Sequence, residues 1–163
     1  MINISYYENN MDNSDIINNI QKSFNVKKTD LNLVPKKTIL ISLIINKVSV
    51  GTICIISNNN LIDYLQKKGM SESMINSNYL FRANTGVYIY NMSVNKNYRG
   101  KGIGHRLLEI TLYVCKQMNF DYCYSHCEND ISRHIFKEKG FNKENTFRNN
   151  KNDIITLMSF WLK

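Results

Sequence analysis

Residues 98–104 have the sequence YRGKGIG, with three glycines on alternate positions and two cations among them. Residues 87–94, just before them, are rich in β-branched and aromatic side chains, which favours a strand. Over residues 103–118 apolar side chains recur at steps of three and four, which predicts an amphipathic helix. The glycines thus lie at a strand-to-helix junction, where the unpaired N–H groups and dipole of a helix N-terminus attract anions. We interpret residues 98–104 as a phosphate-binding loop.

The composition indicates one folded domain with a basic surface. The chain has 163 residues, of which 43% are hydrophobic, and a formal net charge of +8. A chain of this size and apolar content can bury a core of its own. The positive charge favours polyanionic partners in general, which include both nucleic acids and phosphate-rich cofactors. Because the lysines and arginines are dispersed, with no basic helix or run, we expect no dedicated nucleic-acid reader.

The four cysteines indicate a reducing compartment. They lie inside apolar segments rather than in a spaced disulfide framework, and we find neither a signal peptide nor an apolar run of membrane-spanning length. We therefore expect free, mostly buried thiols in a cytoplasmic protein with no membrane partner. In a strand, Cys123 and Cys127 face away from His126, so the three cannot converge on a metal, and we expect none. Cys127 also lacks an evident His–carboxylate pair that would make it an acyl-transfer nucleophile.

Upstream of the loop, the pattern predicts three strands, one helix and a long connection. The strands are expected at 2–7, 38–45 and 48–57. The last two form an antiparallel hairpin around Asn46-Lys47, and apolar residues on one helical face predict a helix at 12–24. Residues 58–85 form an atypical insertion before the next strand, with a helix expected at 61–68. So long a connection is either a mobile surface insertion or a flap over a binding pocket.

Downstream of the loop, the chain predicts a crossover and then a hairpin. The helix after the loop leads to a strand at 121–127, and a strand–helix–strand unit implies parallel pairing with a right-handed connection. Asn129 or Asp130 can cap a further helix, which ends at Gly140 with a left-handed residue. The final strands are expected at 141–147 and 154–162. The fold class is mixed α/β, with hairpins outside and one parallel crossover in the middle.

Residues 92–108 resemble the acetyl-CoA motif of the GCN5-related N-acetyltransferase (GNAT) family. That family's signature is Arg or Gln, two residues, Gly, any residue, then Gly or Ala, and Arg99, Gly102 and Gly104 fill it. Residues 129–141 resemble the family's second block, Asn-x-x-Ala-x-x-Leu-Tyr-Glu-Lys-x-Gly-Phe. A lone glycine motif is weak, whereas two motifs in register are specific.

The resemblance implies a GNAT-like acyl-CoA N-acyltransferase fold, as a single α/β domain over residues 1–163. In that fold a central, mostly antiparallel sheet contains one parallel strand pair that splays apart, and helices flank the sheet. A bulge in the strand before the loop opens a slot for the thioester. We therefore expect the strands ending near Val94 and Cys127 to diverge at their C-terminal ends.

The resemblance also implies acetyl-CoA as co-substrate and assigns residues to it. Backbone amides of the loop would hold the pyrophosphate, and the strand that ends at Val94 would pair with the pantetheine arm. Asn129 would contact that arm, and Lys101 is a candidate for the ribose phosphate. The backbone N–H of Met92 would polarise the thioester carbonyl as an oxyanion-hole donor does. The predicted cofactor-binding residues are Val94, Arg99, Gly100, Lys101, Gly102, Ile103, Gly104, Asn129 and Phe136.

Two departures from the family pattern concern proton transfer. The positions that often hold a Glu or His base are Tyr88 and Tyr90, and an unperturbed phenol has a pKa of about 10. The frequent general acid, a tyrosine, is Phe136, which has no proton to donate. We therefore expect direct attack by the amine. Either a water chain through Tyr88, Tyr90 or Ser125 removes its proton, or the acceptor amine has a lowered pKa of its own. The alternative is that both tyrosines only pack an acceptor pocket.

The predicted function is an acetyl-CoA-dependent N-acetyltransferase that moves an acetyl group directly from the thioester to a primary amine. The acceptor is a small amine, an amino sugar or a peptide amine. The absent acid at Phe136 keeps a CoA-binding pseudoenzyme or regulatory module as an alternative, and the net charge keeps a basic nucleic-acid-binding protein as a weaker one. Many family members dimerise, so the resemblance allows a homodimer, although no stretch of this chain identifies an interface.

Overall fold

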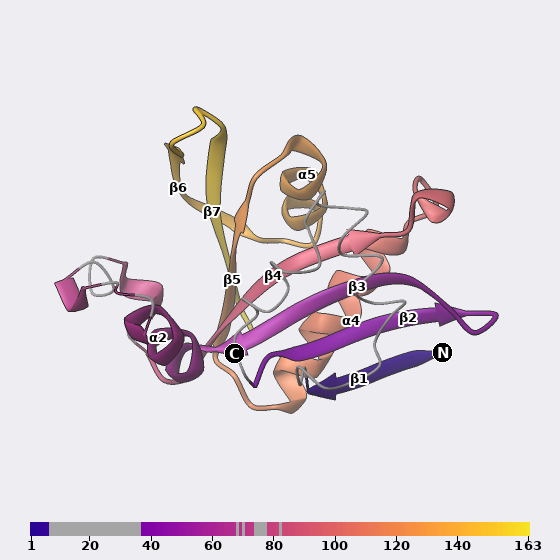
Figure 1. Ribbon diagram of the computed structural model, residues 1–163, viewed down its shortest axis with the longest axis horizontal. Helices are drawn as coiled ribbons and strands as arrows, with labels where there is room; N and C mark the ends of the chain where they lie inside the picture. Colours follow the sequence, from indigo (N-terminus) through magenta and orange to yellow (C-terminus); the bar gives the residue numbers. More distant parts are fainter. Residues whose placement is uncertain (7–36, 68, 70, 74–77, 82) are drawn as a thin grey trace.

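The computed structural model describes the chain apart from residues 7–36, 68, 70, 74–77 and 82 (Figure 1). The helix predicted at 12–24 lies outside the described residues. In the described part, seven strands form one sheet in the order β1-β2-β3-β4-β5-β7-β6. They are β1 (Ile2–Tyr6), β2 (Ile39–Ile45), β3 (Val48–Ser57), β4 (Gly86–Val94), β5 (Tyr122–Cys127), β6 (Asn142–Arg148) and β7 (Ile154–Trp161). Neighbours are antiparallel except β4 and β5, which are parallel, so the predicted mixed sheet is confirmed.

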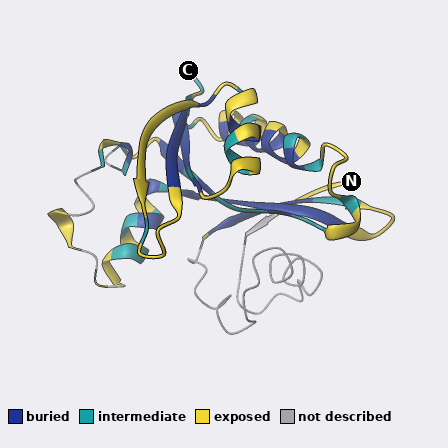
Figure 2. Cartoon of the chain, turned by 90° about the horizontal axis from the view of Figure 1, so that it is seen from above, coloured by how far each residue is buried: buried dark blue, intermediate teal, exposed yellow. Residues whose placement is uncertain are grey.

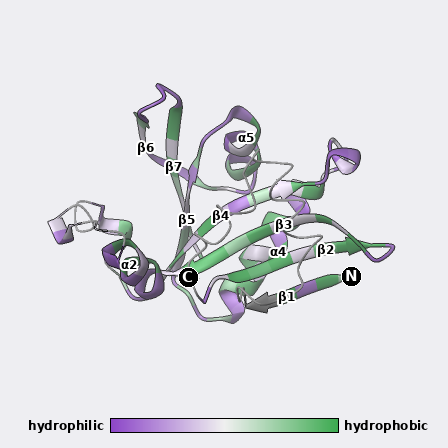
Figure 3. Cartoon of the chain, in the orientation of Figure 1, coloured by the Kyte–Doolittle hydropathy of each residue, from purple (hydrophilic) through white to green (hydrophobic). Residues whose placement is uncertain are grey.

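Helices cover the hydrophobic strands of the sheet. Those of the described residues are α2 (Asn58–Lys67), α4 (Ile103–Gln117) and α5 (Asp130–Glu138). Leu107, Leu108 and Val114 of α4 share one core with Ile135 and Phe136 of α5 and with apolar residues of β2, β3 and β4. Figure 2 shows burial along these strands and exposure on the outer side of the helices, and Figure 3 shows how hydrophobic β2 and β3 are. Burying each such leucine stabilises the fold by about 1.5–3 kcal/mol.

The turn between β2 and β3 needs no glycine. Asn46 and Lys47 both have positive φ, 50° and 65°. Two consecutive left-handed residues are typical of a type I′ turn, whose twist matches that of the flanking strands. Asparagine tolerates this region better than most residues do, which explains the tight turn.

β4 and β5 part soon after they begin. Their parallel pairing joins Gly86 to Tyr122, Val87 to Cys123 and Tyr88 to Tyr124. On its other side β4 is bulged, because its register against β3 shifts between Ser93 and Tyr90, where Asn91 has a φ of 51°. A bulge bends its strand and increases the local twist, which turns the end of β4 away from β5. The predicted bulge and the predicted divergence are confirmed.

The described parts of the 58–85 insertion are anchored to β5. α2 begins at Asn58, earlier than predicted, and this asparagine is 0% exposed. Its Nδ2 donates to the carbonyl oxygens of Leu80 and Ala83 at 2.7 Å each, and its Oδ1 accepts from the Tyr124 hydroxyl at 2.6 Å. From the sequence alone, a run of three asparagines favours a solvent-exposed connection. The burial of Asn58 could not be predicted, because its hydrogen-bond partners lie far along the chain.

The cysteines are core residues. All four are buried and free, as predicted. Burial raises the pKa of Cys54 and of Cys115 to about 12, so both thiols stay protonated and unreactive. In the described part of the chain, no helix combines the length and the apolar character needed to cross a membrane.

Candidate active site

A cavity opens where β4 and β5 part. Its volume is about 310 Å³, and it is lined by both strands and by the start of α5. It brings together six of the predicted site residues, namely Tyr88, Tyr90, Met92, Ser125, Asn129 and Phe136. The predicted residues that do not line it are Val94 and those of the glycine loop at 99–104. The site therefore has a slot between the strands and a separate loop at the N-terminus of α4.

The loop owes its shape to two left-handed glycines. Gly100 and Gly102 have φ of 74° and 76°, and Gly102 is the N-cap of α4, where no side chain caps the helix. A Cβ on either glycine would meet nothing within 4 Å, so glycine is needed here for its backbone conformation rather than for space. The N–H groups that begin α4 are suited to an anion.

Gly104 has a packing role that its place in the motif does not reveal. It is buried, and a Cβ there would lie 2.9 Å from Cδ1 of Ile135. The absence of a side chain lets α4 approach α5 closely. Gly104 therefore allows the start of α4 to pack closely against α5, the helix that Asn129 caps.

Two cations belong to the loop. The Nε of Arg99 donates to the carbonyl oxygen of Val94 at 3.2 Å, which ties the loop to the end of β4. Lys101 places its Nζ 5.4 Å from the centre of the Tyr98 ring, a cation–π contact. Both side chains are exposed, so both charges remain accessible beside the N-terminus of α4.

Asn129 is the N-cap of α5, one of the two residues predicted for that place. Its Oδ1 accepts from the backbone N–H of Ser132 at 2.8 Å. This bond holds the start of α5 at the wall of the cavity. Phe136, about two turns further along α5, is only 2% exposed, and its ring packs against Phe141 with centroids 4.8 Å apart.

Tyr88 and His126 form a hydrogen-bonded pair in the cavity. The Tyr88 hydroxyl lies 3.0 Å from Nδ1 of His126. Burial lowers the pKa of His126, so its imidazole is neutral at neutral pH. Burial raises the pKa of Tyr88, and the nearby Glu128 carboxylate raises it further, so the phenol keeps its proton. A neutral imidazole whose Nδ1 carries no proton can accept a hydrogen bond from the protonated phenol.

Tyr90 has a different environment. Its hydroxyl is hydrogen-bonded to Oγ1 of Thr38, which precedes β2, and its ring stacks on Tyr88 with centroids 5.7 Å apart. Burial raises the pKa of Tyr90 as well. The two tyrosines that the sequence treats alike therefore differ, because only Tyr88 contacts a group that can take a proton.

Sequence reasoning considered His126 only as a metal ligand and missed its pairing with Tyr88. Alternation along β5 places it on the face that carries Tyr124, opposite Cys123 and Cys127. The register that brings Tyr88 beside Tyr124 completes the pair, and that register is a property of the folded sheet. Among the described residues no three His, Cys, Asp or Glu side chains are grouped as a metal site would need.

Ser125 and Cys127 line the cavity from the other face of β5. Burial raises the pKa of the Cys127 thiol to about 11, so the thiol is not a nucleophile at neutral pH. Ser125 is itself buried and hydrogen-bonded to that thiol. Neither residue has a base beside it of the kind that His126 provides for Tyr88.

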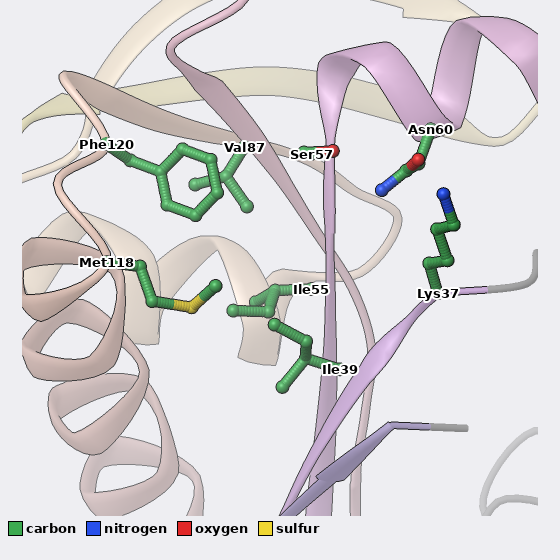
Figure 4. A pocket seen from close by; sticks show the side chains of 8 residues that line it. All are labelled: Lys37, Ile39, Ile55, Ser57, Asn60, Val87, Met118 and Phe120. Atoms are coloured by element: carbon green, nitrogen blue, oxygen red, sulfur yellow. The ribbon is translucent and has the colours of Figure 1, made fainter.

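A second cavity of about 220 Å³ lies beyond the C-terminal end of α4. Its apolar lining consists of Ile39, Ile55, Val87, Met118 and Phe120. Figure 4 shows Lys37 and Asn60 pointing toward each other on the opposite side of this cavity. None of the predicted site residues lines it, so the slot between β4 and β5 is the stronger candidate for an active site.

Comparison with known proteins agrees with this geometry. Residues 10–141 match the model of the Acetyltransferase (GNAT) family. No curated protein matches the sequence.

Solved structures of acetyltransferases share the fold. The ribosomal-protein-S18-alanine N-acetyltransferase from Escherichia coli is 14% identical, with a TM-score of 0.70 over 100% of this chain and 95% of that chain. A Bacillus subtilis acetyltransferase in complex with CoA is 11% identical, with a TM-score of 0.69 over 100% of each chain. An agmatine N-acetyltransferase mutant is 8% identical, with a TM-score of 0.71 over 99% of this chain and 100% of that chain. At such identities the likeness concerns the fold.

Proposed function

Since the chain belongs to the GNAT acetyltransferase family, we propose that it transfers an acetyl group from acetyl-CoA directly to a primary amine. One observation carries this proposal: β4 and β5 pair at three positions and then part around a cavity of about 310 Å³. A thioester on an extended arm enters such a slot from the side of the glycine loop. The solved relative that contains CoA supports a CoA thioester as the donor.

The donor side of the proposal uses the loop and both strands. The loop amides at 99–104 and the exposed Arg99 and Lys101 bind the phosphates, as an uncapped helix N-terminus favours. The arm lies along the end of β4 at Val94 and passes Asn129 and Phe136. The N–H of Met92 polarises the thioester carbonyl, which raises the electrophilicity of its carbon.

The acceptor amine loses its proton through Tyr88. As the amine nitrogen bonds to the carbonyl carbon, its proton passes to the Tyr88 oxygen while the Tyr88 proton passes to Nδ1 of His126. The C–S bond then breaks and the amide is released. The CoA thiolate takes a proton from water, and the His126 imidazolium gives its proton to the hydroxide that remains, which restores the neutral imidazole. The 3.0 Å contact supports this relay, and the lowered pKa of His126 keeps its imidazole unprotonated and therefore able to act at neutral pH. Because Cys127 keeps its proton, direct transfer is favoured over an acyl-cysteine intermediate.

A thiol-release assay tests the proposal. Acetyl-CoA is offered with small amines, amino sugars, polyamines and peptides, and propionyl-CoA and succinyl-CoA replace it in parallel. We expect release that depends on both the amine and acetyl-CoA, and mass spectrometry should find the acetyl group on the amine. Thiol release with succinyl-CoA but not with acetyl-CoA would contradict acetyl-CoA as the donor.

Phe136 favours one competing function, a CoA-binding module without catalysis. No proton donor occupies this position, and the ring is buried against Phe141. That alternative predicts a rise in melting temperature with CoA but no thiol release with any amine. We further propose a single-domain cytoplasmic enzyme, for which the four free thiols are the support. A homodimer stays a prediction that gel filtration can test.

A further inference from the structure

One face of β4 and β5 carries a continuous layer of aromatic rings. The members of this ring layer are Phe81, Tyr88, Tyr90, Tyr124, His126 and Phe147. Neighbouring rings have centroids between 5.2 and 5.9 Å apart. Tyr124 belongs to a small cluster apart from the α4 core, whereas Cys123 and Cys127 belong to that core. The ring layer therefore lies on the face of the sheet away from α4.

Four elements supply these rings. Phe81 comes from the insertion, Phe147 from β6 in the C-terminal hairpin, and the others from β4 and β5. Tyr124 is fully buried at the centre, while the other rings keep exposed area, which reaches 43% for Phe147. The layer thus offers a binding surface with a buried support beneath it.

The surface is held in place before any ligand arrives. Asn58 fixes the carbonyls of Leu80 and Ala83, and the Phe81 ring between them packs edge-on against Tyr124 with centroids 5.5 Å apart. Burial raises the pKa of the Tyr79 hydroxyl, and the Glu144 carboxylate of β6 lies close enough to raise this pKa further, so the insertion lies next to β6. A prebuilt surface lowers the entropic cost of binding a flat ligand.

The charge near the layer suits one ammonium group rather than several. Glu128 is the one carboxylate among the described residues that line the cavity. Aromatic faces bind flat apolar bodies by stacking and bind ammonium groups through their π-electrons. A polyamine carries several ammonium groups, and each of them would need a carboxylate of its own.

We propose that the acceptor is a single primary amine carried on an aromatic body, with the body on the ring layer and the nitrogen at the Tyr88 hydroxyl. This inference rests on the proposed acetyl transfer and names the substrate class of the same site. Tyr88 and His126 are members of the layer, so a ligand stacked on it reaches the proton relay. Phe81 and Phe147 are then specificity-determining residues outside the chemistry.

The test compares four amines with acetyl-CoA: 2-phenylethylamine, n-butylamine, glucosamine and spermidine. We expect kcat/KM for 2-phenylethylamine to exceed that for each of the others by about 10-fold or more, a typical margin for added apolar contact. Phe147→Ala should raise the KM for 2-phenylethylamine about 10-fold and the KM for n-butylamine by a smaller factor. The KM for acetyl-CoA should stay constant. Tyr113→Ala is the control, because Tyr113 is a 66% exposed ring on α4.

Different results would contradict the aromatic amine as acceptor and acetyl transfer itself. Faster transfer to spermidine or glucosamine than to 2-phenylethylamine overturns the inference while acetyl transfer stands. If no amine releases thiol, NMR titration of the protein with 2-phenylethylamine in the presence of CoA decides the matter. Binding that Phe147→Ala weakens and Tyr113→Ala does not then supports the ring layer as an amine site, and absence of binding overturns it.

Discussion

In the proposed mechanism, His126 of β5 accepts the proton that leaves the acceptor amine through Tyr88. Its imidazole has an ordinary pKa of 6.5, and burial lowers this pKa. A base must be unprotonated to act, so the rate falls as the pH drops through the lowered pKa and stays constant above it. The acid limb of the profile should therefore lie below pH 6.5.

The first prediction concerns the fall of kcat at acid pH, with kcat measured at saturating concentrations of both substrates. His126→Gln should lower kcat by about 10²-fold or more and remove the limb, because the proton acceptor is gone. His134→Gln is the matched control, since His134 is an exposed histidine on α5. An unchanged acid limb in His126→Gln would show that another group titrates.

The second prediction separates the two tyrosines of β4. Tyr88→Phe keeps the ring and removes the hydroxyl that bonds to His126, so kcat should fall by about 10–100-fold. Tyr90→Phe removes a hydroxyl that bonds to Thr38, and its loss in kcat should be much smaller. Single-turnover rates at saturating acceptor measure both. Equal losses in the two variants would contradict the relay through Tyr88.

At the scale of elements, the glycine loop depends on backbone conformation. Gly102 has a φ of 76°, and a side chain there would meet no neighbour within 4 Å. The third prediction is that Gly102→Ala lowers the free energy of unfolding by about 1–2 kcal/mol, the cost of a left-handed L-residue. Gly102→Asn should cost less, because asparagine visits this region more readily. Urea unfolding of both variants measures the difference, and equal costs would refute a purely conformational cause.

The fourth prediction concerns Asn58, which fixes the insertion to β5. Asn58→Ala removes three hydrogen bonds and leaves the Tyr124 hydroxyl without its acceptor, whereas the carbonyls of Leu80 and Ala83 each keep a second donor. The unsatisfied hydroxyl costs about 1–3 kcal/mol and each of the two lost bonds to a carbonyl about 0.5–1.5 kcal/mol, so the free energy of unfolding should fall by about 2 kcal/mol or more. Asn59→Ala, one position along α2 and exposed, should change it by less than about 0.5 kcal/mol. Similar values for the two variants would mean that Asn58 does not hold the insertion.

The local sequence pattern predicts most helices and strands of this fold. It does not predict contacts that depend on how distant strands pair. The stripe of α4, the cap at Asn129 and the divergence of β4 from β5 depend on residues close in sequence or on the family motif. The pair formed by Tyr88 and His126 depends on which strand positions face each other. The burial of Asn58 likewise depends on Tyr124 in a distant strand, and a run of asparagines carries no sign of it.

At the scale of the whole molecule, the net charge affects which ligands the protein binds. The chain has a formal net charge of +8, which favours association with a polyphosphate ligand. The fifth prediction is that CoA at 100 times its Kd stabilises the protein by about 2.7 kcal/mol. For a domain of this size that raises Tm by about 5–10 °C. Differential scanning fluorimetry at two salt concentrations measures the rise, which should shrink at the higher one. No rise with CoA would contradict the donor site.

The parting of β4 and β5 leaves two backbone edges in the middle of a sheet. An edge strand normally risks pairing with another protein chain and so promotes aggregation. Here the space between the edges is a cavity of about 310 Å³, which is too small for a strand with side chains and large enough for one thin arm. A pantetheine arm carries amide groups of its own, so it can use the hydrogen-bonding positions that a missing strand would use. The proposed CoA donor would then complete the sheet when it binds, and the same internal edges that admit it would be protected from foreign strands.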